Sequence, residues 1–170
     1  MNFLKSEYFE IHKLTKPDLY NNQYLDGKFK FIKLSLTLDI EFQISNEDRN
    51  TKISLATFEE LFYKFYQKFD NTFLDKLINQ TINSLSNDIG KYKRKNEIDR
   101  LRNRVKLSDI VFSFERYLDF HTDDDIPPYS ERNEIIMRFL DKDFLNSHEI
   151  VVEIESNDDF AFKEAYFEHI

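Results

Sequence analysis

The chain of 170 residues contains no cysteine, no tryptophan, two glycines and three prolines. Without cysteine it can form neither a disulfide nor a thiolate metal site, and a thiol nucleophile is excluded. Because small secreted domains usually depend on disulfides, their absence favours a reducing compartment, and we expect a cytoplasmic protein. Two glycines cannot build a Gly-rich phosphate-binding loop, and so few chain breakers indicate long regular elements.

Long apolar runs are missing as well. No stretch of about 18 consecutive apolar residues occurs, so we expect no membrane span. The first residues hold no apolar run of signal-peptide length. The abundance of Lys, Asn, Ile and Phe over Gly and Ala is typical of AT-rich bacterial or viral genomes.

Phenylalanine is unusually frequent, with 18 residues beside nine tyrosines. This predicts a core built from bulky rings, each of which buries a large area. The length suits a single domain that spans residues 1–170.

The clearest structural signal is a period-two alternation over residues 28–44, which predicts one long, half-buried strand. The phase of the alternation changes at Phe31 and Ile32, where we expect a β-bulge. Residues 51–55 and 150–154 predict two shorter strands, and residues 9–11 predict an edge strand. Along one face of the long strand lie six apolar residues: Leu34, Leu36, Leu38, Ile40, Phe42 and Ile44.

Helical periodicity follows over residues 58–89, with Thr57 as the expected N-cap and Gly90 as the expected C-terminal cap. A break at Asp70 divides this stretch into two helices in one interpretation. Residues 107–120 fit a strand or a helix equally well, and we favour a helix. Residues 131–145 predict another helix, capped by Ser130. The fold class is therefore α+β, a small and mostly antiparallel sheet with three or four helices packed on one side.

Charge is distributed unevenly along the chain. Residues 91–106 carry eight basic and two acidic side chains, whereas residues 107–170 carry five basic and 17 acidic ones. In one interpretation the two segments fold together and neutralise each other. In the other, each segment meets a separate partner, because a dense acidic surface steers toward a basic protein.

The basic segment is a candidate contact for nucleic acid, because cationic side chains attract phosphate. It contains one aromatic residue, Tyr92, whereas grooves for single strands interleave aromatics with the charges. The sequence pI near 5.1 also differs from the basic balance of a dedicated nucleic-acid binder. The residues of this alternative contact are Lys91, Lys93, Arg94, Lys95, Arg100, Arg102, Arg104 and Lys106.

Arg116 and His121 are separated by four residues. This short pattern resembles the Arg-to-His spacing of HEPN ribonucleases, with Tyr117 where that family usually has a polar residue. The resemblance implies that the pair lies on a helix of an all-helical fold. It also implies that Arg116 and His121 cleave RNA by acid–base chemistry in a dimer. We keep catalysis by Arg116 and His121 as the alternative interpretation.

His121 is followed by Asp123, Asp124 and Asp125, which offer nitrogen and oxygen ligands in one loop. The spacing does not match the calcium-binding loop, which needs Gly at its sixth position and Glu at its twelfth. We therefore expect a solvated loop, no metal site and no cofactor.

The acidic C-terminal part combines carboxylates with aromatic residues and suits contact with a basic protein. We see no catalytic apparatus and favour a binding protein over an enzyme. It would be an immunity-type or phage-encoded inhibitor that occludes a basic, nuclease-type partner, with a structural or assembly subunit as a third class. The expected partner-binding residues are Asp119, Asp123, Asp124, Asp125, Glu153, Glu155, Asp158, Asp159, Phe160, Phe162 and Tyr166.

Overall fold

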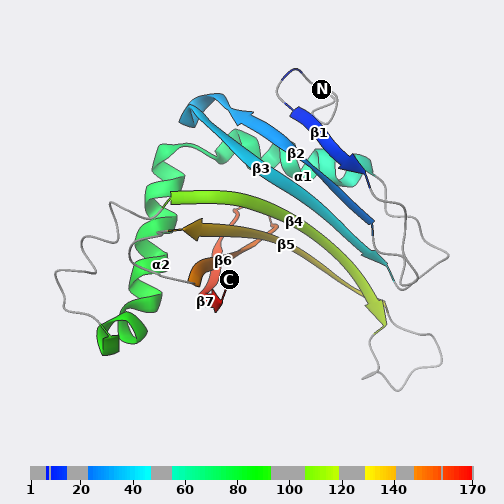
Figure 1. Cartoon of the computed structure of the whole chain (residues 1–170). Helices are drawn as coiled ribbons and strands as arrows, with labels where there is room; N and C mark the ends of the chain where they lie inside the picture. The colour runs from blue at the N-terminus through cyan, green and yellow to red at the C-terminus, as the bar shows by residue number, and fades with distance from the viewer. Residues whose placement is uncertain are drawn as a thin grey trace.

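The computed structural model describes residues 7, 9–14, 23–46, 55–92, 106–118, 129–140, 148–157 and 159–169. These residues form one seven-stranded sheet, in which the strands lie side by side in chain order, and two helices (Figure 1). The strands are β1 (Phe9–Leu14), β2 (Gln23–Phe31), β3 (Leu36–Asn46), β4 (Lys106–Leu118), β5 (Tyr129–Leu140), β6 (His148–Glu155) and β7 (Phe162–His169). The helices are α1 (Leu55–Lys68) and α2 (Asn71–Tyr92).

Neighbouring strands are antiparallel except for β3 and β4, which are parallel. A parallel pair needs a long crossover connection, because the chain must return to the end from which it started. The connection between Asn46 and Lys106 contains both helices, and Figure 1 shows them on the same side of the sheet. Among the described residues, the other side of the sheet carries no helix.

The expectation of a small sheet with three or four helices is wrong. The sheet has seven strands, and the described part of the chain contains two helices. Most of residues 107–120, for which we favour a helix, form strand β4, and most of the helix expected over residues 131–145 is strand β5. In β5 the core residues Ile135, Met137 and Phe139 alternate with period two, as a sheet requires, whereas β4 is buried at five consecutive positions, Ile110 to Phe114.

The prediction of a single long strand over residues 28–44 is also wrong. It is two antiparallel strands, β2 and β3, joined by a 3-10 turn at Ile32–Leu34. Ser35 closes this turn with φ of 52°, in the left-handed region. The phase change at Phe31 therefore marks a chain reversal rather than a bulge. Phe31 pairs directly with Leu36 across the hairpin.

The predicted break at Asp70 is confirmed, since α1 ends at Lys68 and α2 begins at Asn71. The Asp70 carboxylate accepts a hydrogen bond from the Phe73 backbone N–H at 2.9 Å, as an N-cap does. The three predicted caps are wrong. Helix α1 begins at Leu55, before Thr57, α2 continues through Gly90 to Tyr92, and Ser130 lies on strand β5.

The predicted Phe-rich core is confirmed and lies between the sheet and the helices. Phe62 of α1 is fully buried, and its ring centroid lies 4.7 Å from that of Phe29 and 5.3 Å from that of Phe112. Both contacts are edge-to-face, the arrangement that aromatic quadrupoles favour. Phe62 thus connects the first helix to β2 and β4, the two neighbours of β3 in the sheet.

We expect Phe62→Ala to lower the free energy of unfolding by about 3–5 kcal/mol, because it removes a buried ring and leaves a cavity. The neighbouring Tyr63 is 45% exposed and provides the control, for which Tyr63→Ala should cost about 1 kcal/mol or less. Urea denaturation measures both values. Equal losses in the two variants would contradict the placement of Phe62 at the centre of the core.

Candidate functional site

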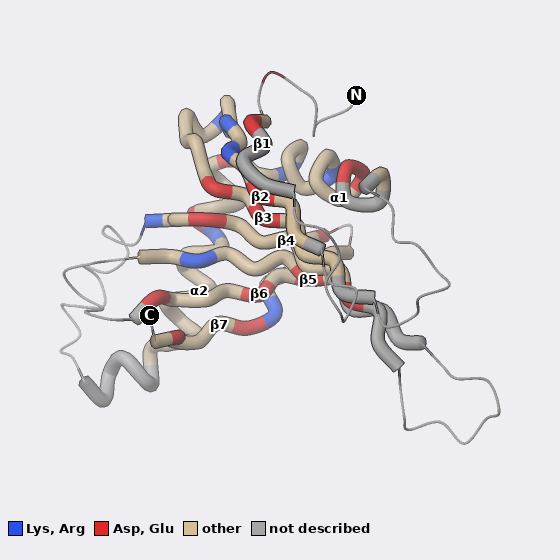
Figure 2. The backbone as a smooth tube through the Cα atoms, turned by 45° about the vertical axis from the view of Figure 1, so that its right-hand side comes forward, with Lys and Arg blue, Asp and Glu red and all other residues tan. Residues whose placement is uncertain are grey.

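The face of the sheet opposite the helices, called the open face below, is strongly acidic. The register of the strands assigns side chains to it, since residues paired across neighbouring strands point to the same side. Figure 2 shows acidic positions on successive strands of the sheet. Among the side chains that the structure describes, five basic residues lie on this face: Lys28, Lys30, Lys106, Arg138 and Lys163. Twelve carboxylates lie there: Glu10, Asp26, Asp39, Glu41, Asp109, Glu115, Glu134, Glu149, Glu153, Glu155, Glu164 and Glu168.

The helical side does not share this imbalance. Helices α1 and α2 each contain two acidic and two basic residues, so their formal charge is zero. The excess of negative charge in the described part of the chain is therefore concentrated on the open face.

A β-bulge at the start of β7 places Lys163 on the open face. Glu153 pairs with Glu164 but Ile154 pairs with Phe162, so Lys163 is the extra residue of β7. Such a bulge re-aims the side chain of the inserted residue. Lys163 and Glu164 consequently both point to the open face, although they are consecutive in the sequence.

Lys163 joins two buried carboxylates. Its Nζ donates hydrogen bonds to Glu134 Oε1 at 2.5 Å and to Glu153 Oε2 at 2.9 Å. The Tyr166 hydroxyl donates to the other oxygen of Glu153 at 3.3 Å. Glu134 and Glu153 are 9% and 7% exposed, and at this depth an unpaired charge would be costly. The lysine thus places one positive charge between two neighbouring buried carboxylates.

The hydrogen bonds to Glu134 and Glu153 raise the pKa of Lys163 above its ordinary 10.5. Burial raises the pKa of Tyr166 above 10.0, and the negative charge of Glu153 acts in the same direction. Both groups therefore hold their protons more tightly in the folded protein than in the unfolded chain.

Arg138 forms a second ion-pair group on the same face. Its guanidinium lies 3.0 Å from Asp109 and 3.4 Å from Glu149. Burial raises the pKa of Glu149 above 4.5, since it outweighs the lowering by Arg138, and the charges of Asp109 and Glu168 add to the increase.

Other carboxylates of the open face stay available. Glu164 and Glu168 are exposed, and no hydrogen bond or ion pair with another described residue engages them. Arg138 and Lys163 thus pair with four carboxylates at the centre of the face, Asp109, Glu149, Glu134 and Glu153, and leave Glu164 and Glu168 of β7 without a cation among the described residues.

The residues predicted for partner binding fall into three groups. Glu153, Glu155 and Tyr166 lie on the open face. Asp159 is exposed and pairs with Lys68 at 3.7 Å, whereas Phe160 is 2% exposed and packs in the core, so it is not a surface anchor. Phe162 is half-buried and packs against the core as well. The remaining acidic positions lie outside the described residues: Asp119, Asp123, Asp124, Asp125 and Asp158.

The alternative sites cannot be assembled from the described residues. Arg116 lies on strand β4, so the helix that the HEPN resemblance implies is not there, and His121 lies outside the described residues. Lys106 is exposed at the start of β4, and Lys91 belongs to the last turn of α2. The other basic residues lie outside the described part: Lys93, Arg94, Lys95, Arg100, Arg102 and Arg104.

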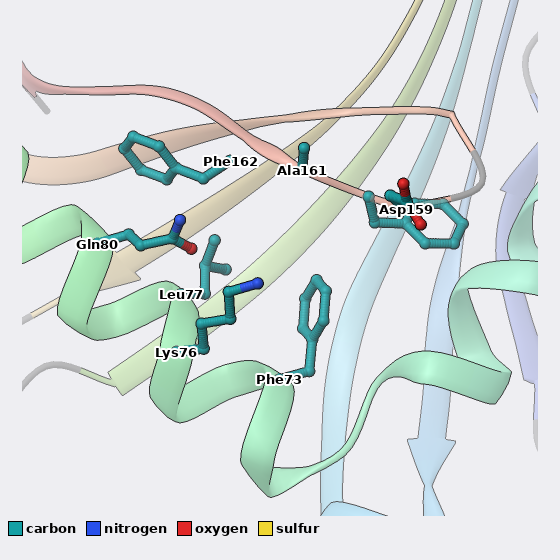
Figure 3. A pocket seen from close by; sticks show the side chains of 8 residues that line it. Phe73, Lys76, Leu77, Gln80, Asp159, Ala161 and Phe162 are labelled. Carbon is teal, nitrogen blue, oxygen red and sulfur yellow. The ribbon is translucent and has the colours of Figure 1, made fainter.

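A hollow of about 350 Å³ lies between α2 and the connection from β6 to β7 (Figure 3). Phe73 and Leu77 of α2 line it together with Phe162, and Lys76 and Gln80 supply polar groups. Phe160 also contributes, with φ of 50°. The Asn157 side chain accepts a hydrogen bond from the Phe160 N–H at 3.1 Å and holds this turn. The hollow has the volume of a small-ligand site but lacks a buried polar group that would orient a ligand.

Sequence reasoning missed most of the open face. Asp109, Glu134 and Glu149 come from three strands and meet through Arg138 and Lys163, which no linear spacing reveals. Glu164 and Glu168 lie on strand β7, where no strand is predicted from the sequence. The signal that could have found them is the period-two placement of Glu164, Tyr166 and Glu168.

Comparison with protein-family models, with curated proteins and with solved structures found no match. Neither of the described helices combines the length and the apolar character that a membrane span needs. Within the described part of the chain, no group of three or more His, Asp or Glu side chains could hold a metal ion.

We expect Lys163→Met to lower the free energy of unfolding at pH 7 by about 1–3 kcal/mol, because it leaves Glu134 and Glu153 buried without their cation. Adding Glu134→Gln and Glu153→Gln to this variant should recover part of the loss. Lys28→Met is the matched control, since the Lys28–Asp39 pair is exposed and 3.7 Å apart, and it should cost less than about 1 kcal/mol. Chemical denaturation measures all of these variants; equal losses for Lys163 and Lys28 would refute the role of Lys163.

The raised pKa values of Lys163 and Tyr166 predict a loss of stability at alkaline pH. Above pH 10 the unfolded chain releases these protons before the folded protein does, so the free energy of unfolding falls as pH rises through the folded pKa values. Below the ordinary pKa values the contribution is complete. Between pH 9 and 11 the native protein should therefore lose stability more steeply than the variant Lys163→Met/Tyr166→Phe. Parallel curves of unfolding free energy against pH for the two proteins would show that folding does not change the pKa values of Lys163 and Tyr166.

Proposed function

We propose that this protein binds a basic protein through the acidic open face of its sheet, and that it acts as an inhibitor that occludes the partner's cationic surface. An immunity-type or phage-encoded inhibitor of a nuclease-type protein is the specific form of this proposal. The observation that carries it is the twelve carboxylates and five basic residues on the face that no described helix covers, beside helices of zero formal charge.

The composition of the face supports this proposal. A surface with one dominant sign of charge raises the association rate with an oppositely charged partner. Tyr24 and Tyr166, 38% and 39% exposed, point to the same face from strands β2 and β7. Exposed tyrosines among charges are the type of residue that becomes an anchor when an interface closes.

The internal ion pairs supply rigidity rather than neutrality. Lys163 and Arg138 fix four carboxylates in place but leave the acidic excess on the face. A partner would therefore meet a face whose centre is fixed before binding, and this lowers the entropy cost of association. Nucleic acid, with its negative backbone, would be repelled by this face, so the alternative depends on the basic segment 91–106, most of which lies outside the described part.

The test is affinity capture from a nuclease-treated native lysate, followed by binding kinetics with the captured protein. We expect a partner of basic pI whose association rate falls steeply with salt. The open-face variant Asp39→Asn/Glu164→Gln/Glu168→Gln should slow association by about tenfold or more.

The matched control is Glu59→Gln/Glu60→Gln/Asp75→Asn, which changes the net charge equally but lies on the helices. It should alter the association rate by less than about twofold if the location of the charge on the molecule determines that rate. Equal effects of the two variants, or a captured partner of acidic pI, would contradict the proposal. Capture that disappears on nuclease treatment would favour the nucleic-acid alternative instead.

A further inference from the structure

We propose that strand β7 is the docking edge of this surface: an extended segment of the partner, with Lys or Arg at every second position, adds to β7 as a further strand of the sheet. This inference rests on the proposed function and specifies how the partner is held. It concerns the backbone edge of the sheet, whereas the proposal above concerns the charge of its face.

The edge is geometrically suited to strand addition. β7 is the last strand in the order and pairs with β6 alone among the described strands. The bulge at Lys163 lies at its beginning, so residues 164–169 keep a regular register. At the other edge, β1 has six residues and a register shift between Ile11 and Lys13, which interrupts the edge near its middle. Interrupted edges resist pairing, whereas a regular edge offers unpaired backbone groups as a template.

The side chains of β7 define the sequence that would fit. Glu164, Tyr166 and Glu168 point to the open face and are exposed. Ala165 and Phe167 point to the helical side, pack against the core and are half-buried. A strand next to β7 would therefore place alternate residues beside two carboxylates and the others beside an apolar surface. The fitting segment alternates Lys or Arg with apolar residues, as cross-strand pairing favours.

The same charges disfavour a second copy of this chain. An antiparallel pair of β7 strands centred on Tyr166 would place Glu164 opposite Glu168 of the other copy, twice. Like charges directly opposite each other destabilise a strand pair. The carboxylates thus select against self-pairing and for a cationic strand.

The probe is a synthetic peptide of nine residues that alternates Lys and Val. We expect it to bind the full-length protein and to slow amide hydrogen exchange in residues 164–169, measured by NMR. The same peptide N-methylated at its four central residues keeps its charges but loses the donors of strand pairing. Its affinity, measured by calorimetry, should be at least about tenfold lower, because main-chain hydrogen bonds supply the affinity in strand addition.

Two charge variants locate the binding site. Glu164→Gln/Glu168→Gln should weaken peptide binding by about tenfold. Asp39→Asn/Glu41→Gln removes the same charge from β3, on the same face but away from the edge, and should weaken it by less than about twofold.

Equal affinity of the plain and N-methylated peptides, with equal sensitivity to the two charge variants, would overturn the inference. It would leave the proposed function intact, since the face would then attract cations without using its edge. Slowed exchange at β7 together with failure to capture any basic protein would contradict the proposed function. The preference of the β7 edge for a cationic strand would still stand. A dimer in sedimentation that protects residues 164–169 without peptide would show that a second copy occupies the edge, and would also overturn the inference.

Discussion

The parallel pairing of β3 with β4 determines where the rest of the molecule can lie. Strands that run in the same direction need a long crossover, and here the crossover carries both helices. The remaining connections join antiparallel neighbours, which need no crossover. The helices therefore bury one face of the sheet through the phenylalanine cluster, and the charged side chains of the strands are left to the other face.

The fold could be predicted from the sequence where a local pattern and the tertiary environment agree. The alternation over residues 36–44, the strand at 150–154 and the helix break at Asp70 are of this kind. Strand β5 was missed because its sequence, with Ile135, Ile136 and Met137 in a row among Glu and Arg, fits a helix as well. Pairing with β4 and β6 decides in favour of a strand, and this long-range contact has no local signal.

The candidate site was predictable to a smaller degree. The acidic excess of the C-terminal part is visible in the sequence, and Glu153, Glu155 and Tyr166 were expected to face a partner. The partners of these residues come from other strands, as Glu134 does when it meets Lys163 at 2.5 Å. The bulge that turns Lys163 toward Glu134 interrupts the period-two alternation of β7. For this reason neither the strand nor the orientation of its charged side chains was predicted. Conversely, Phe160 looks like a surface anchor in the sequence, but its left-handed backbone turns it into the core.

The separation of charge between the two sides of the sheet has a physical cost that needs a reason. Carboxylates on neighbouring strands repel one another, and redistributing a few of the lysines of α1 and α2 would relieve this repulsion without touching the core. The chain instead keeps balanced helices and an acidic open face. Lys163 and Arg138 remove the repulsion where the carboxylates are buried, while Glu164 and Glu168 at the exposed edge are left without such a cation among the described residues. The carboxylates thus repel one another where they are solvated, and cations relieve the repulsion where it would be most destabilising. A surface selected for a cationic partner would show this pattern.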